Sequence, residues 1–293
     1  MGTSKDPSPA MHVRVGTCGY SYDDWRGVFY PADLPKWKFL GYYAEHFGTV
    51  ELNATFYRFP EAKNLEAMAE RTPEGFSFVV KAHQSITHRR GAEGEEAFPK
   101  FRELLKPFDD RGKLGGVLVQ FPYSFRASAE SMDYVRRAAA GLDLAPVVAE
   151  FRHISWFSAE NLNVLRQSGI SLCCVDEPDL PGLPPAAAEV TGAVGYVRFH
   201  GRNKENWFSK DGGPKPGEYI GNERGKTGRP AAERYRYLYS EDELQGWLPK
   251  IAAMESKTPV VYAFFNNHPG GNAVRNAREL HRLVTSEAPR DEV

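Results

Sequence analysis

Three pairs of polar residues, each spaced by two positions, lie at the ends of apolar runs in this 293-residue chain. The pairs are Glu51 with Asn53, Glu150 with Arg152, and Arg198 with His200. Side chains alternate between the two faces of a β-strand, so the members of each pair project from the same face. Two carboxylates and a histidine can act as general acid and base, and arginines can hold an anion such as phosphate by paired hydrogen bonds. We therefore predict Glu51, Glu150 and His200 as catalytic residues.

Other polar side chains lie at or just beyond the predicted strand ends and complete a ring of candidate substrate-binding residues. This ring consists of Asn53, Lys81, His88, Gln120, Arg152, Trp156, Asp176, Arg198, Arg202, Asn266, Asn267 and His268. Trp156 is included because an aromatic ring there could stack on a base or a sugar. The alternative is structural: charged side chains are rarely buried without partners, so opposite charges could form a salt-bridge layer. Its members would be Glu51, Glu150, Lys81, Arg152 and Arg198.

The inventory of metal ligands is small. The carboxylates and imidazoles near the predicted strand ends are Glu51, Glu150, Asp176, His200 and His268. This set favours one hard divalent ion, or none, over a zinc cluster. No glycine-rich dinucleotide fingerprint and no P-loop occur, so neither a nicotinamide nor a flavin cofactor is expected, and ATP hydrolysis is disfavoured.

The three cysteines, Cys18, Cys173 and Cys174, are an odd number and include an adjacent pair, so a disulfide framework is not expected. Cys18 follows the first predicted strand and could be a nucleophile, although packing at the barrel top is the simpler interpretation. The polar N-terminus has no apolar core of the kind a signal peptide needs. With no long apolar stretch, these features predict a soluble cytoplasmic protein with no membrane partner.

The elements that must position the ring follow a regular alternation. Strand-like runs occur at 13–19, 49–56, 76–82, 115–121, 147–152, 171–176, 195–200 and 259–266. Helical patterns occur at 36–47, 97–108, 128–140, 155–167 and 272–285. Repeated strand and helix units with one long connection predict an α/β fold, a single (β/α)8 TIM-type barrel with its site at the C-terminal rim. The predicted domain spans 12–287, with a disordered lead-in at 1–11 and a tail at 288–293.

The long connection, about residues 202–239, is an insertion between predicted strands seven and eight. It contains nine basic and five acidic residues with six aromatic residues among them, in a chain whose net charge is −1. Basic charge mixed with aromatic rings suits a phosphodiester chain. A glycine-rich lid over a small molecule, or a disordered loop with incidental charge, is an equally weighted interpretation.

Several longer motifs are shared with a known family. They include Gly16-Thr-Cys-Gly-Tyr-Ser-Tyr22, Val50-Glu-Leu-Asn-Ala-Thr-Phe-Tyr57, Val119-Gln-Phe-Pro122, Glu150-Phe-Arg-His153, Tyr196-Val-Arg-Phe-His-Gly-Arg202 and Phe265-Asn-Asn-His268. Over about residues 12–285 the chain resembles the YecE-like proteins, a family of unknown function. The resemblance implies a TIM-type barrel, broadly similar to the endonuclease IV and xylose isomerase group, and implies no established activity.

Three functional hypotheses follow. The first is an enzyme, of the phosphodiesterase or nuclease type, acting on a phosphate-containing substrate such as a nucleic acid or nucleotide. The second is a nucleic-acid-binding protein without chemistry, which uses the rim and the basic insertion. The third, a sugar isomerase-like carbohydrate enzyme, rests on barrel analogy alone. The oligomeric state is left open by the sequence.

Overall fold

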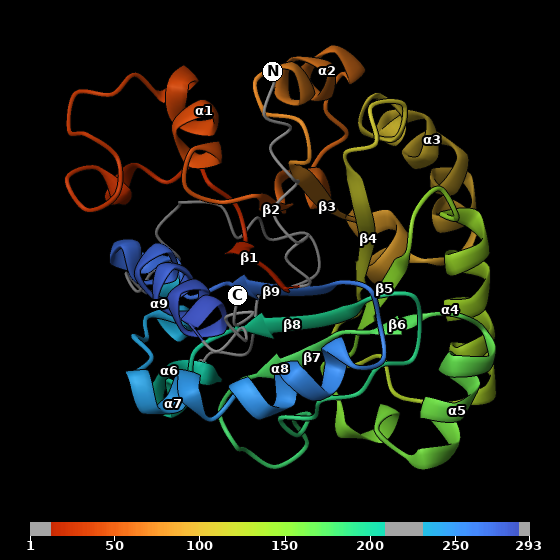
Figure 1. Ribbon diagram of the computed structural model, residues 1–293. Helices are drawn as coiled ribbons and strands as arrows, with labels where there is room; N and C mark the ends of the chain where they lie inside the picture. The colour runs from red at the N-terminus through yellow and green to blue at the C-terminus, as the bar shows by residue number, and fades with distance from the viewer. Residues whose placement is uncertain (1–12, 209–230, 287–293) are drawn as a thin grey trace, which may run out of the picture.

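The computed structural model describes residues 13–208 and 231–286, and its strands form two parallel sheets surrounded by helices (Figure 1). The first sheet has the order β1 (Val13–Thr17), β9 (Val261–Phe265), β8 (Gly195–Phe199) and β7 (Cys174–Asp176). The second has the order β2 (Thr49–Leu52), β3 (Ser77–Lys81), β4 (Leu114–Gln120), β5 (Val147–Glu150) and β6 (Ser171–Leu172). The predicted α/β fold with parallel strands is thus confirmed.

The two sheets adjoin at both sides. Strands β6 and β7 belong to one extended run interrupted at Cys173, whose N–H donates to the carbonyl of Ala149 at 2.9 Å. On the other side, a parallel bridge joins Cys18 to Glu51, and the N–H of Gly19 donates to the Glu51 carbonyl at 2.7 Å. The strands therefore follow one another around the molecule in the order that the eight predicted units require.

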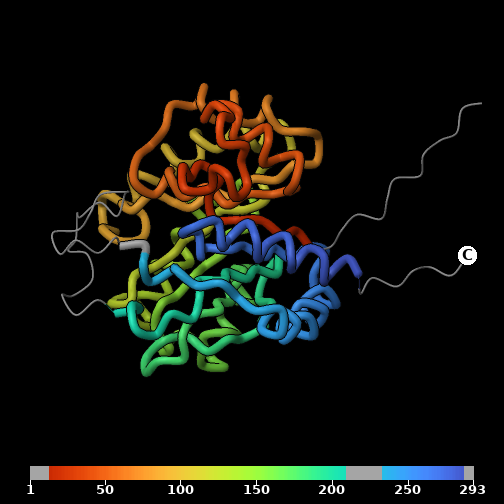
Figure 2. Tube along the Cα trace, turned by 90° about the vertical axis from the view of Figure 1, so that its left-hand side faces the viewer, coloured from red at the N-terminus to blue at the C-terminus, as the bar shows by residue number. Residues whose placement is uncertain are grey.

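Nine α-helices occur within the described residues, and they surround the strands (Figure 1). They are α1 (Phe39–Ala44), α2 (Ala62–Glu70), α3 (Gly91–Asp109), α4 (Ala129–Gly141), α5 (Ala159–Gln167), α6 (Lys204–Trp207), α7 (Glu241–Gln245), α8 (Leu248–Glu255) and α9 (Asn272–Ser286). Figure 2 shows the helix α9 lying beside β1, so that the two ends of the described chain pack together.

Alternation along the strands separates two apolar clusters. Residues such as Val50, Phe78 and Val117 face outward and pack in the larger cluster beneath the helices. Residues such as Val79 and Leu118 face inward and fill the interior. The interior is thus a packed core and not a pore, as is usual for parallel strands covered on both faces.

Some element ends differ from the sequence prediction for local reasons. The strand predicted over 49–56 ends at Leu52, because Asn53 adopts helical angles (φ −99°, ψ −16°) and starts a 3-10 turn over Ala54–Phe56. The helix predicted from Ser155 begins at Ala159, because Ser158 caps it by accepting a hydrogen bond from the Asn161 N–H at 3.2 Å.

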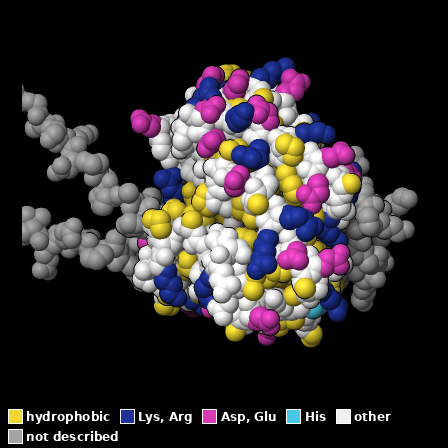
Figure 3. All heavy atoms as spheres, turned by 90° about the vertical axis from the view of Figure 1, so that its right-hand side faces the viewer, with side chains coloured by type: hydrophobic (Ala, Val, Ile, Leu, Met, Phe, Trp, Pro, Cys, Tyr) yellow, Lys and Arg dark blue, Asp and Glu magenta, His cyan; other side chains and the backbone are white. Residues whose placement is uncertain are grey.

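The predicted lead-in, the predicted tail and positions 209–230 of the insertion lie outside the described residues. Within the described ranges, no helix is long and apolar enough to cross a membrane. On the face shown in Figure 3, acidic and basic side chains are interspersed with apolar ones. This mixture agrees with the nearly balanced composition of 37 basic and 38 acidic residues.

Candidate functional site

An ionised layer closes the top of the apolar interior. Arg198 on β8 donates from Nη1 to Glu150 Oε2 at 2.5 Å and from Nη2 to Glu51 Oε1 at 2.7 Å. Tyr196, two residues earlier on the same face, donates its hydroxyl to Glu51 Oε2 at 2.7 Å. The side chains of the two glutamates are 0% exposed and that of Arg198 is 2% exposed. This part of the ring therefore has the geometry of the predicted salt-bridge layer.

Glu150 is held ionised within this layer. Burial alone would raise its pKa, but the guanidinium groups of Arg152 and Arg198 outweigh burial and hold the pKa well below its ordinary value. Arg152 Nε lies 2.6 Å from Glu150 Oε1, in a contact that is not aligned as a hydrogen bond. Glu150 consequently links the closed layer below to the groups above it.

A second layer, nearer the solvent, contains Arg152 and a residue absent from the predicted ring, Glu177. The side chain of Arg152 is 15% exposed, and its Nη1 donates to Glu177 Oε2 at 3.2 Å. Burial raises the pKa of Glu177 to about 7, against the opposing effect of Arg152. A carboxyl group with this pKa can give or take a proton near neutral pH.

Alternation along the sixth strand run could have identified Glu177. Cys173 and Val175 pack in the interior, so the next residue of the same parity is 177 and not 176. The sequence analysis places Asp176 in the ring because the apolar run ends there. In the structure Asp176 projects from the opposite face, among the residues under the helices.

His200 lies in the same wall as Glu150 and is neutral at pH 7. Burial, followed by the charge of Arg152, lowers its pKa to about 3. Its Nδ1 pairs with the side-chain amide of Asn266 at 3.0 Å, and with that amide as donor the proton of the neutral ring lies on Nε2. Nε2 is 3.3 Å from Glu150 Oε1. The structure thus brings two of the three predicted catalytic side chains into contact.

Lys81, at the end of β3, is the rim cation with the fewest polar partners. Its Nζ donates to Gln120 Oε1 at 2.8 Å and lies 4.2 Å from the centroid of the Phe56 ring. Among the described residues it forms no ion pair with a carboxylate. Burial, followed by the charge of Arg198, lowers the pKa of Lys81 to about 7.

His88 lies near Lys81, on the loop that follows the third strand. Its ring is 4.9 Å from the Phe56 ring, and burial together with the charge of Lys81 lowers its pKa to about 4. The loop contains a π-helical turn, Ser85–Arg89, that ends at Arg90 with φ 53° and ψ −157°. Arg90 is the one non-glycine residue with positive φ in the described structure, and strained backbone of this kind often accompanies functional loops.

Several buried polar atoms around this mouth lack a well-aligned hydrogen bond within the described residues. They are Asn53 Oδ1, Glu150 Oε1, Glu177 Oε1, Arg198 Nε and His200 Nε2. Native proteins leave few buried polar atoms unsatisfied, so a group of them in one place needs an explanation. A bound ligand or ordered water would satisfy them.

Four predicted substrate-binding residues lie elsewhere than in the ring. Asp176 and Arg202 pair with each other on the outer face, through Nε to Oδ1 at 2.8 Å and Nη2 to Oδ2 at 2.6 Å. Asn267 is fully buried and donates to the carbonyl of Tyr237 at 2.9 Å. These three residues hold the segment around 237 in place. The carboxylate of Asp176 and the guanidinium of Arg202 are satisfied by protein partners, whereas Asn267 Oδ1 has no hydrogen-bond partner within the described residues.

Trp156 is the fourth of these residues. It is 0% exposed, stacks on Phe151 with ring centroids 3.9 Å apart, and donates Nε1 to the Phe125 carbonyl at 2.7 Å. No face of the ring is open to a base or a sugar. His268 is half-buried and stacks on Tyr22 with centroids 4.5 Å apart, at the edge of the mouth and apart from Glu150.

The ring does not assemble a metal site from the described residues, where no three His, Cys, Asp or Glu side chains converge on one point. We therefore assign no residues to a metal ion. Cys18 Sγ is buried and 3.4 Å from Arg198 Nη2, and burial raises its pKa well above the usual thiol value. The thiol is thus placed as packing and not as an activated nucleophile.

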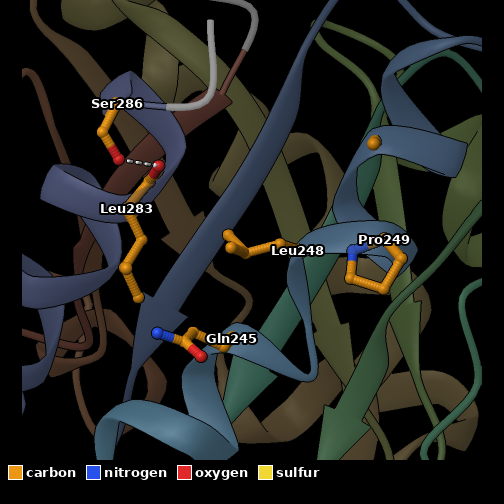
Figure 4. Close-up of a pocket in the computed structure, with 6 residues that line it drawn as sticks. Gln245, Leu248, Pro249, Leu283 and Ser286 are labelled. Atoms are coloured by element: carbon orange, nitrogen blue, oxygen red, sulfur yellow. Dashed lines mark hydrogen bonds between the residues drawn. The ribbon is translucent and has the colours of Figure 1, made fainter.

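One surface hollow lies away from the rim. It measures about 320 Å³ and lies on the outside between α8 and α9, lined by Gln245, Leu248, Pro249, Ala252, Leu283 and Ser286 (Figure 4). The one polar contact drawn there is the Ser286 hydroxyl donating to the Leu283 carbonyl at 2.9 Å. Since no ionisable side chain lines this hollow, the mouth with Glu177, His200 and Lys81 is the better candidate site.

The fold and the site together define an α/β protein with parallel strands and a ring of charged residues at their C-terminal ends. The chain belongs to the family described as "Protein of unknown function DUF72", whose model matches residues 14–292. The YecE-like proteins, which the sequence motifs resemble, are this same family.

Known relatives cover nearly the whole chain. The UPF0759 protein YunF of Bacillus subtilis (strain 168) is 34% identical over 286 residues, which are 94% of this chain and 95% of that protein. A DUF72 family protein from Thermotoga maritima MSB8 has a crystal structure that matches with a TM-score of 0.80 and 35% identity, over 93% of this chain and 99% of that one. A DUF72 family protein from Enterococcus faecalis V583 matches with a TM-score of 0.78 and 26% identity, over 93% and 95%. None of these names states an activity.

Proposed function

We propose that the protein is an enzyme that hydrolyses a phosphate-bearing substrate, with a nucleotide or the end of a nucleic acid as the favoured class, at the mouth above Glu150 and Arg198. The observation that carries the proposal is Lys81. Its ammonium group stands at the mouth within the electrostatic influence of Arg152 and, in the described part of the chain, has no carboxylate partner. An anion placed there would restore the balance of charge and form charge-assisted hydrogen bonds.

The unsatisfied atoms support a substrate that also carries hydroxyl groups. Asn53 Oδ1 and Glu177 Oε1 are acceptors, and both lack an aligned donor among the described residues. Ribose hydroxyls are donors of the required kind. A phosphate group on Lys81 and Arg152, with sugar hydroxyls on the acceptors, would satisfy both sets of atoms with one small molecule.

The side chains divide into roles by their protonation. Glu177, with a pKa of about 7, would protonate the leaving oxygen as general acid. Glu150 stays ionised and fixes Arg152, while neutral His200 faces Glu150 through Nε2. Arg198 bridges the two buried glutamates, which keeps the floor of the site rigid.

Binding is tested by calorimetric titration of the purified protein with inorganic phosphate and with adenosine monophosphate. Lys81→Met should weaken both by at least about tenfold, since a hydrogen bond to a charged group contributes about 1.5–3 kcal/mol. Lys113→Met is the matched control. Lys113 is also half-buried, but its Nζ donates to the carbonyls of Ala69 at 2.6 Å and Thr72 at 2.7 Å, away from the rim.

Turnover is tested with chromogenic phosphate monoesters and diesters, on the wild type and on Glu177→Gln. The proposal expects hydrolysis that phosphate inhibits and that Glu177→Gln lowers at least 100-fold. The proposal would be refuted if phosphate and adenosine monophosphate bound equally well to the wild type and to Lys81→Met and no substrate were hydrolysed. Oligonucleotide binding that requires Lys81 but is never followed by cleavage would favour the non-catalytic hypothesis, whose basic segment lies mostly at positions 209–230, outside the described residues.

A further inference from the structure

We infer that Lys81 is a nucleophilic amine, which condenses with the aldehyde of a phosphorylated open-chain sugar to form an imine at the mouth. The inference rests on the proposed phosphate site and narrows its substrate from any phosphate ester to one that also carries a reactive carbonyl. It assigns Lys81 a covalent role beside its role in holding an anion.

The position of Lys81 is that of a reactive group and not of a structural one. It is the last residue of β3, and its parity directs it into the mouth with Val79 below it in the interior. Its polar contact is the neutral amide oxygen of Gln120 at 2.8 Å, and its apolar contact is the Phe56 ring at 4.2 Å. Neither neighbour requires the nitrogen to be charged.

The surrounding charges favour the neutral amine. Arg198 and Arg152 both disfavour the ammonium form, and the opposing effects of Glu150 and Glu51 are smaller than burial and Arg198 combined, so the pKa falls to about 7. His88, whose ring lies 4.9 Å from the Phe56 ring, is neutral at pH 7 and adds no charge of its own. At neutral pH about half of the Lys81 side chains would therefore carry a free electron pair.

The reaction balances without an oxidant or a reductant. The nitrogen electron pair forms a bond to the carbonyl carbon while the carbonyl π electrons move to oxygen, which takes up a proton. The proton that leaves nitrogen passes to this hydroxyl group. The nitrogen electron pair then forms the second carbon–nitrogen bond as the carbon–oxygen bond breaks and water leaves, and a protonated imine remains. Arg152 would hold the phosphate during these steps, because its guanidinium stays charged at any physiological pH.

Lys113 supplies an internal contrast. Burial lowers its pKa as well, but its Nζ donates to three oxygen atoms, the carbonyls of Ala69 and Thr72 and the Thr72 hydroxyl at 3.1 Å. Three acceptors hold the ammonium form in place and occupy its protons. Lys113 should therefore remain unreactive even though burial lowers its pKa too.

The test uses pyridoxal 5′-phosphate as a phosphate-bearing aldehyde reagent, followed by borohydride and peptide mass spectrometry. At pH 7 Lys81 should be labelled at least about 30-fold faster than exposed lysines such as Lys63 and Lys100. The rate should rise through pH 7 and level off by about pH 8. Inorganic phosphate should slow the labelling, and Lys113 should behave like the exposed lysines.

Lys81→Arg separates the inference from the proposed function. This variant keeps a cation but has no amine, so it should lose the fast label, while phosphate binding is measured on the wild type. If phosphate binds but Lys81 is labelled no faster than exposed lysines, the amine role is refuted and the phosphate site stands. If Lys81 is labelled fast but phosphate gives no protection, the amine role stands and the phosphate site is refuted.

Two further probes identify the source of the aldehyde. Ribose 5-phosphate and an oligonucleotide with an abasic site each present a phosphorylated open-chain sugar, and borohydride would trap either on Lys81. Trapping of ribose 5-phosphate alone would indicate a free sugar phosphate. Trapping of the oligonucleotide at 100-fold lower concentration would indicate a nucleic acid, and trapping of neither would overturn the inference.

Discussion

Two clusters of buried charge lie on opposite faces of the same strands, and they differ in how completely their polar atoms are satisfied. On the outer face, Asp176 accepts four hydrogen bonds: two from Arg202, one from the Tyr239 hydroxyl at 2.8 Å and one from Trp247 Nε1 at 2.7 Å. On the inner face, Glu150, Glu177 and His200 each keep one buried atom without an aligned partner in the described structure.

The difference separates a structural cluster from a recognition site. A buried polar atom left unsatisfied costs about 1–3 kcal/mol, so a fold retains several of them together only where another molecule or water completes them. The carboxylate oxygens of Asp176 all have partners, and we expect substitutions in this cluster to lower the free energy of unfolding. The rim cluster has buried atoms without aligned partners, and we expect substitutions there to change ligand affinity and the pH dependence of stability.

The largest effect should come from removing the centre of the complete cluster. Asp176→Ala leaves the buried Trp247 Nε1 without an acceptor, leaves the Tyr239 hydroxyl only its longer contact of 3.3 Å with the carbonyl of residue 176, and removes the charge that Arg202 faces. We expect the free energy of unfolding to fall by about 4 kcal/mol, as for other broken buried pairs. Urea unfolding followed by tryptophan fluorescence would measure it.

Asp179→Ala is the matched control, since Asp179 is an exposed carboxylate three positions away on the same segment. Its removal should change the unfolding free energy by less than about 0.5 kcal/mol. A loss of similar size in both variants would mean that the hydrogen bonds of Asp176 are not what stabilises this face.

The second effect is a pH dependence on the rim side. Because the pKa of Glu177 is raised to about 7, the folded protein holds a proton there that the unfolded chain releases at about pH 4.5. Stability from this group is therefore present at acidic pH and is lost as the pH rises from about 4.5 to about 7. At about 1.4 kcal/mol per pKa unit, the loss is up to about 3 kcal/mol.

Glu177→Gln should remove this loss, because an amide does not ionise. Urea unfolding at pH 4.5 and at pH 8 would show the free energy of unfolding of the variant rising relative to that of the wild type as the pH rises. Glu160→Gln, at an exposed position in α5, should follow the wild type throughout. Parallel pH profiles for wild type and Glu177→Gln would show that the rim carboxylate is ionised and satisfied, which would remove the contrast between the clusters.

The smallest effect concerns backbone strain, which the described structure shows beside the rim but not at Asp176. Arg90 has a positive φ that glycine adopts without penalty, so Arg90→Gly should relieve about 1–3 kcal/mol of strain. The loss of the Arg90 contact with the Phe125 ring, 4.9 Å away, offsets about 0.5–1 kcal/mol of this. We expect a net gain of about 1 kcal/mol in thermal or urea unfolding.

Arg89→Gly provides the comparison, because Arg89 lies within the preceding helical turn. This substitution should lower the free energy of unfolding by about 0.5–1 kcal/mol. Equal losses in the two variants would show that the loop carries no strain at Arg90.

The sequence predicted the fold and the lower layer of the site because both depend on strand alternation. Parity alone places Glu51, Glu150 and Arg198 on one face, and the structure joins them in one layer. The same alternation places Glu177 on this face, but only if the strand predicted over 171–176 is extended beyond its last apolar residue. The prediction for Asp176 failed because the end of a run does not reveal the face on which it ends.

Other parts of the site depend on distant contacts that no local pattern records. Trp156 follows a polar strand end, as a ligand-stacking ring would, yet Phe125 and Phe151 stack on it and its side chain is fully buried. Asn267 is adjacent to Asn266 in the sequence, but its partners are Tyr237 and Asn276. The unsatisfied atoms at the mouth are likewise a property of the assembled structure.

Glu51 contributes its side chain to the site and its backbone to the bridge with Cys18. The carboxylate of Glu51 faces Arg198, and its carbonyl accepts from the Gly19 N–H in the one bridge that joins β1 to β2 among the described residues. Glu51 therefore belongs both to a junction of the two sheets and to the electrostatic floor of the site. The Gly19 amide is in consequence a built-in reporter, whose hydrogen exchange registers both the opening of that junction and the occupancy of the mouth above it.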